Sequence, residues 1–272
     1  MAYTNFKATI WSKHIENELS KLMVFRDVVN TKHQGEVGRG KTVKIIGLTN
    51  PTIKTYVPGT EISGAETPAD NATNLEINQY KYFNVMVDDV DQAQADTEIM
   101  KGLLAGGANG LAAAADSYIA SLVKNATNVI PTTQVTTAAK AKEIVDSAFE
   151  KLWDKGVNTA NGSTYICISP WFYSLFKNAL TETLTNNVDM VSKGIIGMYN
   201  GAYVKLSNNI YNDGTDDYCA VMTKNAIAFA DGIEKTDAYR PDASFADAVK
   251  SLYTYGAVLA RPEQIVCMKV HK

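Results

Sequence analysis

The most regular hydrophobic pattern in the chain lies in residues 88–124. Apolar or small residues recur there at steps of three and four, which keeps one face of an α-helix dry. They are Met100, Leu104, Ala108, Leu111, Ala115, Ile119 and Leu122. Asp88 and Asp89 open the stretch, and carboxylates suit the free amide groups of a helix N-terminus. The pattern predicts one long amphipathic helix, reaching roughly 50 Å at ~1.5 Å per residue, that serves as a spine for the other parts of the chain.

A second stripe on the same segment consists of small residues, at Gly102, Gly106, Gly110 and Ala113. A glycine in a helix interior costs up to about 1 kcal/mol relative to alanine, so this stripe needs a reason. In one interpretation the glycines let another backbone come close or let the helix bend. In the other, residues 105–110 break the helix in two. The apolar phase continues through the glycines without a slip, which favours the first interpretation.

Two segments of different character precede the expected spine helix. Residues 9–23 carry apolar residues at helical spacing and predict a short amphipathic helix in an N-terminal arm. Residues 42–82 predict a long extended excursion, in which Val43 and Ile45 alternate with polar residues before residues 82–87 return as a strand. Five turn formers punctuate it: Pro51, Pro58, Gly59, Gly64 and Pro68. Because a loop of this length is usually functional or packed on a partner, we expect these residues to lie between subunits.

The C-terminal half predicts a mixed layer of helices and strands, which makes the fold class α+β. Helices are expected at residues 137–155 and 171–180, where apolar residues recur at helical spacing. Strands are expected where short apolar runs are bounded by turn formers, at residues 163–169, 202–206, 218–222, 227–230, 233–239, 248–255 and 264–270. Residues 124–137 are rich in Thr and Asn and contain Pro131. They predict a polar linker and a domain boundary.

Composition bounds the class of protein. With 272 residues, 46% hydrophobic and 20% charged, the chain can bury a core, so it is neither disordered nor fibrous. A formal net charge of −3 argues against a surface that binds nucleic acid throughout. Residues 1–44 nevertheless hold eight Lys/Arg against four Asp/Glu, which leaves −7 for the remainder. Such a basic arm suits contact with another copy of the chain or locally with DNA, although a merely solvated arm fits equally well.

Candidate chemistry is sparse. Cys167, Cys219 and Cys267 are odd in number and far apart, so they predict small buried hydrophobes and not a disulfide framework or a zinc site. The three histidines lack metal-ligand spacing. No signal peptide and no stretch of 18 apolar residues is visible. We therefore expect a soluble protein made in the cytoplasm, with no catalytic residue, no metal, no cofactor and no membrane partner.

One motif suggests catalysis. Gly35, Gly40, Lys41 and Thr42 satisfy the pattern of a phosphate-binding loop, in which backbone amides and the lysine hold phosphates. That mechanism needs a helix to begin at the lysine. The residues that follow, 42–46, are instead strongly β-forming. We interpret the motif as a glycine turn feeding a strand, and a nucleotide site as the alternative.

The order of these parts resembles the major capsid proteins of tailed bacteriophages with the HK97-type fold, especially the P22-like coat proteins. The resemblance covers nearly the whole chain and is carried by short phrases in a consistent order. They lie at residues 40–43, 78–83, 87–91, 115–116, 168–170, 194–197, 207–208, 255–256 and 261–263.

The resemblance implies a domain organisation. Residues 1–41 would be the N-arm, 42–80 the E-loop and 81–124 the P-domain with its spine helix. Residues 125–231 would form the A-domain, 232–256 the P-domain strands, and 257–272 a return strand to the A-domain.

It also implies a function without catalysis: self-assembly into pentamers and hexamers of an icosahedral head that encloses double-stranded DNA. A portal, a separate scaffolding protein and decoration proteins would be partners, the virion would be the location, and the bacterial host cytoplasm the place of synthesis. Shell expansion would change the shape of the spine helix and the E-loop. Two alternatives stand beside this one: an encapsulin shell, which has the same fold, and a P-loop NTPase.

Overall fold

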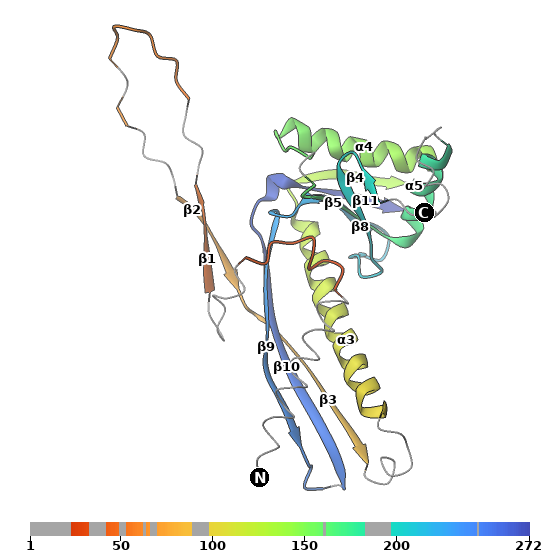
Figure 1. Cartoon of the computed structure of the whole chain (residues 1–272). Helices are drawn as coiled ribbons and strands as arrows, with labels where there is room; N and C mark the ends of the chain where they lie inside the picture. Colours follow the sequence, from red (N-terminus) through yellow and green to blue (C-terminus); the bar gives the residue numbers. More distant parts are fainter. Residues whose placement is uncertain are drawn as a thin grey trace.

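The computed structural model describes residues 23–32, 42–48, 53–61, 64–65, 70–88, 98–159, 162–182, 197–243 and 245–272. The helix expected at residues 9–23 lies outside this part of the chain, except for its last residue. In the described residues the fold consists of a projecting hairpin, a long three-stranded sheet flanked by one helix, and a six-stranded sheet flanked by two helices (Figure 1).

The hairpin is built from β1 (Thr42–Leu48) and β2 (Asp70–Glu76), which pair antiparallel over their full length. Val43 and Leu75 pair directly and are both buried, while their neighbours in each strand are exposed. This is the alternation that the sequence predicts for a strand with one dry face. The described part of the loop beyond the two strands projects away from the rest of the protein (Figure 1).

The three-stranded sheet has the order β3-β10-β9, with all pairs antiparallel. Its strands are long: β3 spans Gln79–Asp88, β9 Ile227–Tyr239 and β10 Ala246–Leu259. The helix α3 (Glu98–Leu122) runs along one face of this sheet, followed by the 3₁₀ turn η2 (Val123–Asn125) (Figure 1). The predicted apolar stripe of α3 is confirmed, since Leu104, Ala108, Leu111, Ala115 and Ile119 are all buried in one core with strand residues.

The six-stranded sheet has the order β4-β11-β8-β5-β7-β6. Its strands are β4 (Asn128–Gln134), β5 (Thr164–Ile168), β6 (Met198–Tyr199), β7 (Ala202–Leu206), β8 (Asp217–Thr223) and β11 (Ile265–His271), the last preceded by the turn η3 (Pro262–Gln264). The helices α4 (Ala138–Asp154) and α5 (Pro170–Glu182) cover one face and share a core with it. The other face packs against the end of α3 that lies uppermost in Figure 1.

The segment of residues 23–30, called here the N-terminal segment, lies inside the protomer. Met23, Phe25, Val28 and Val29 are all buried in the core that α3 shares with both sheets. Asn30 extends the sheet by a parallel bridge to Ala228, at the free edge of β9. The part of the expected N-terminal arm that the structure describes is therefore a core element.

Two sequence expectations about boundaries are wrong. Asp88 is the last residue of β3 and pairs with Ala246, so it does not cap the spine helix, because strand pairing there outweighs a local cap signal. The described helix has 25 residues and a length of about 37 Å, and residues 89–97 of the expected helix lie outside the described part of the chain. The glycines do not break it.

The predicted linker at residues 124–137 is also wrong, because it contains β4, which pairs parallel with β11. Proline is tolerated in an edge strand, where a missing N–H does not interrupt the sheet. The register shifts beside Pro131, between the pairs Ile130–Met268 and Thr133–Val270. A Thr- and Pro-rich composition therefore describes an edge strand as well as it describes a linker.

Candidate functional site

The loop of the projecting hairpin exposes large apolar side chains. Ile53 is 92% exposed, Tyr56 62% and Val57 57%. Pro58 and Gly59 form the turn beyond them, where Gly59 has φ +89° and the Thr60 hydroxyl donates to the Val57 carbonyl at 2.7 Å. A Cβ added at Gly59 or at Gly64 would meet nothing within 4 Å. Pro51 and Pro68 lie outside the described residues.

A second apolar surface lies on the three-stranded sheet. Phe83 and Val85 of β3 pack toward α3, so by strand alternation Tyr80, Tyr82 and Met86 point to the opposite face. Tyr82 is 75% exposed and Met86 64%. These three residues are called the outer face below. The sequence analysis did not predict the outer face, although the alternation of side chains along residues 79–88 indicates it.

The glycine stripe of α3 is open on its outside. A Cβ added at Gly102, Gly106 or Gly110 would meet nothing within 4 Å, apart from the helix's own backbone. The glycine that packs closely is instead Gly107, whose added Cβ would lie 3.0 Å from ring carbons of Phe83. The close approach inside this protomer is therefore made at Gly107, which does not belong to the predicted stripe.

The phosphate-loop motif does not have the structural context that it needs. Gly35, Gly40 and Lys41 lie outside the described residues, but Thr42 begins β1 and pairs with Glu76. A phosphate-binding loop places a helix N-terminus at this point, so that its amides face the phosphates. The strand expected from the sequence is confirmed at the place where a nucleotide site would require a helix.

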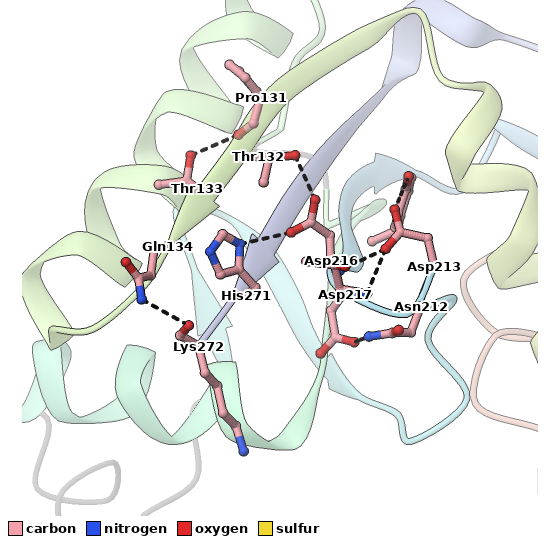
Figure 2. Close-up of polar contacts among 12 residues, drawn as sticks. Pro131, Thr132, Thr133, Gln134, Asn212, Asp213, Asp216, Asp217, His271 and Lys272 are labelled. Atoms are coloured by element: carbon pink, nitrogen blue, oxygen red, sulfur yellow. Dashed lines mark hydrogen bonds and ion pairs between the residues drawn. The ribbon is translucent and has the colours of Figure 1, made fainter.

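A polar cluster joins the C-terminal strand to the β4 edge (Figure 2). The Thr132 hydroxyl donates to Asp216 Oδ2 at 2.7 Å, and His271 Nδ1 lies 2.9 Å from Asp216 Oδ1. In a nucleophilic triad the imidazole stands between the hydroxyl and the carboxylate. Here the carboxylate stands between the other two groups, so the imidazole is not placed to activate the Thr132 hydroxyl. The cluster ties β4 and β11 to the turn before β8.

That turn is held by its own side chains. The Asp213 carboxylate accepts the N–H groups of Thr215 and Asp216 and the hydroxyl of Tyr218, at 2.8–3.0 Å. These hydrogen bonds lower the pKa of Asp213. Asn212 donates to Asp217 across the turn. Among the described residues, no group of three His, Cys, Asp or Glu side chains could hold a metal ion.

The three cysteines lie buried on neighbouring strands. Cys167 on β5 and Cys267 on β11 both pair with Ala220 of β8, on opposite sides of it, and Cys219 precedes Ala220. All three thiols are free, and burial raises the pKa of each. The expectation of small buried hydrophobes is confirmed. No described helix is long and apolar enough to span a bilayer.

The chain is similar to several capsid structures. It matches a structure from Mycobacterium phage Che8 with a TM-score of 0.76 and 25% identity, over 90% of each chain. The capsid structure of cyanophage P-SCSP1u gives a TM-score of 0.73 at 15% identity, over 92% of this chain and 88% of that one. The capsid of a native GTA particle gives 0.66 at 10% identity, over 92% and 90%. No protein-family model and no curated protein matches the sequence.

Proposed function

We infer that this chain, which has the α+β HK97-type fold, is a major capsid protein of a tailed bacteriophage and forms the shell of the head. The observation that carries the inference is the match to the Che8 structure over 90% of both chains, with a TM-score of 0.76. The extent of the match matters, because similarity over 90% of both chains covers most of the architecture and not one sheet alone.

Exposed apolar residues support the proposal that contacts with other copies of the chain bury surfaces that the single chain leaves open. Ile53 on the hairpin loop and Tyr82 on the outer face are both more than 70% exposed. Fully burying a large apolar side chain is worth roughly 1.5–3 kcal/mol, and clusters of such residues mark interaction surfaces. Identical subunits offer the same two surfaces many times over, so closed symmetric assembly can cover both.

The proposal also includes the finer features of the assembly. The shell consists of pentamers and hexamers around double-stranded DNA, the hairpin loop lies over a neighbouring subunit, and the spine helix bends during expansion. A portal, a separate scaffolding protein and decoration proteins are its partners. The exposed apolar loop supports the contact with a neighbouring subunit, and the open glycine face of α3 supports the bend.

Electron microscopy of the purified protein tests the function. Closed hollow particles of uniform size are expected, either from the protein alone or after co-expression with a scaffolding protein. Monodisperse small species under both conditions would overturn the proposal. The content of the particles separates the two kinds of shell: double-stranded DNA is expected for a phage head, whereas a packed protein cargo would identify an encapsulin-type container.

A further inference from the structure

The N-terminal segment crosses α3 between the two sheets, where it is the red part of the chain in Figure 1. One side chain holds its first main-chain amides: Asp116 Oδ2 accepts the N–H of Val24 at 2.9 Å, and Oδ1 accepts the N–H of Phe25 at 3.2 Å. Asp116 belongs to α3 and is 1% exposed. A carboxylate that accepts two consecutive N–H groups fixes both the position and the direction of the backbone that carries them.

The next two side chains of the segment reach the two sheets. Arg26 lies 3.3 Å from Asp231 of β9, in the three-stranded sheet. Asp27 lies 3.5 Å from Lys205 of β7, in the six-stranded sheet. The Asp231 side chain is 5% exposed, whereas the Asp27 side chain is 71% exposed. Because exposed ion pairs contribute little to stability, the contact between Asp27 and Lys205 holds the segment less firmly than the buried contacts do.

Main-chain hydrogen bonds hold the other end of the segment. The Asn30 N–H donates to the Ile227 carbonyl, and the Asn30 carbonyl accepts the N–H of Phe229, both at 2.9 Å. Between the two ends, Val28 and Val29 are buried in a core that includes residues of α3 and of both sheets. The segment therefore contacts α3, β9 and the six-stranded sheet at the same time.

The chain connections between the two sheets are short and can act as hinges. They are residues 123–127, 224–226 and 260–264. A few residues at the ends of elements are enough to absorb a change of angle between two packed units. A segment packed between the units opposes such a change, because the sheets cannot rotate apart without breaking the contacts on one side of it.

We propose that Asp116 is a positioning residue, which anchors the N-terminal segment between the two sheets and thereby fixes the angle between them. Hydrogen bonds to a charged group are stronger than those between neutral groups, and a buried N–H left without a partner is costly. Loss of the carboxylate therefore releases the whole segment and not only two amides. The inference concerns the single chain and does not depend on the formation of a shell.

Hydrogen exchange of the full-length protein reads the attachment of the segment. Asp116→Ala should lower the protection of the Asn30 and Phe229 amides by about tenfold or more. These two amides lie at the far end of the segment from Asp116, so a loss confined to Val24 and Phe25 would be a local effect and would overturn the proposal. The amides of α4 are the internal reference. An equal loss of protection in α4 would show general destabilisation and would overturn it as well.

A distance measured between the two sheets reads the angle. Spin labels are attached at Lys81→Cys in β3 and Glu150→Cys in α4, which are exposed positions. The native thiols are buried, and the chain without added cysteines corrects for any labelling of them. Labelled chains are diluted with unlabelled ones, so that distances within one chain are measured. The distance distribution should be narrow with Asp116 present and broader with Asp116→Ala. An unchanged width in a variant whose segment is released would refute the positioning role.

Two further variants control both measurements. Asp116→Asn keeps one acceptor oxygen and should retain part of the protection; it is also the probe if Asp116→Ala does not fold. Asp27→Ala removes the exposed ion pair with Lys205 and should match the wild type in protection and in distance distribution. An effect of Asp27→Ala as large as that of the Asp116 variants would show that Asp116 is not the anchor.

Discussion

The backbone of Glu76 lies directly against Gly256, so that a Cβ on residue 256 would stand 2.1 Å from the Glu76 carbonyl oxygen. Glu76 is the last residue of β2, and Gly256 lies within β10. The projecting hairpin therefore leaves the body of the protein by crossing β10 at the one residue type that has no side chain. The crossing fixes the direction in which the loop projects, because a larger residue would lift β2 off the sheet.

Gly256→Ala should therefore destabilise the protomer by on the order of 1–3 kcal/mol, since the backbone must move to admit the methyl group. Gly232→Ala is the matched control. Gly232 lies in the neighbouring strand β9, and its added Cβ would meet nothing within 4 Å. Urea denaturation of both variants measures the difference. Equal stability of the two would show that the crossing relaxes without cost.

Adjacent glycines in α3 give a second prediction. Gly106→Ala adds a methyl group in open space and should stabilise the protomer by up to about 1 kcal/mol through helix propensity. Gly107→Ala places its Cβ 3.0 Å from Phe83, so packing strain should offset that gain. Thermal unfolding of the two variants measures the difference in stability.

Gly106→Ala also tests the proposed role of the open glycine face. If that face meets a neighbouring backbone or bends during expansion, Gly106→Ala should impair shell maturation although the protomer is more stable. Particle yield and expansion, scored by electron microscopy, provide the readout. Normal maturation of Gly106→Ala would contradict the role, as would a loss of stability equal to the loss of maturation.

Local periodicity predicts most of this fold. The stripe on α3, the strand after Thr42 and the helix expected at residues 137–155 all follow from neighbours in the sequence, and the structure confirms them. Partners distant in the sequence decide the rest. Residues 128–134 look like a linker until β11 pairs with them, and Asp88 looks like a helix cap until Ala246 extends its strand.

The candidate site also divides into residues that the local sequence predicts and residues that depend on distant partners. Pro58, Gly59 and Gly64 mark the loop from composition alone, because turn formers have a local signature. Gly107, Gly256 and Asp116 have no such signature, since each is defined by what it meets: Phe83, Glu76 and the amides of the N-terminal segment. Periodicity cannot show which glycine packs closely or which carboxylate accepts hydrogen bonds from a segment more than 90 positions away.

The buried cysteines give a prediction about reactivity. Burial raises the pKa of Cys219 to about 12 and that of Cys267 to about 11, and it shifts Cys167 in the same direction. At pH 8 the thiolate fraction of Cys267 is then on the order of one in a thousand. An aromatic disulfide reagent should label none of the three thiols in the native protein and all three in denaturant. Rapid labelling of any thiol without denaturant would show that the six-stranded sheet opens locally.

The hairpin loop gives the most direct test of assembly. Replacing Ile53, Tyr56 and Val57 by serine together, or deleting residues 51–68, should leave a folded protomer, because the described loop residues are exposed and contribute little to either core. Assembly should fail, since the apolar contact with the neighbouring subunit is lost. Glu61→Ser, an exposed polar change in the same loop, is the control and should assemble normally. Circular dichroism checks the fold and electron microscopy the particles. Normal shells from the triple-serine variant would show that these side chains are not buried between subunits.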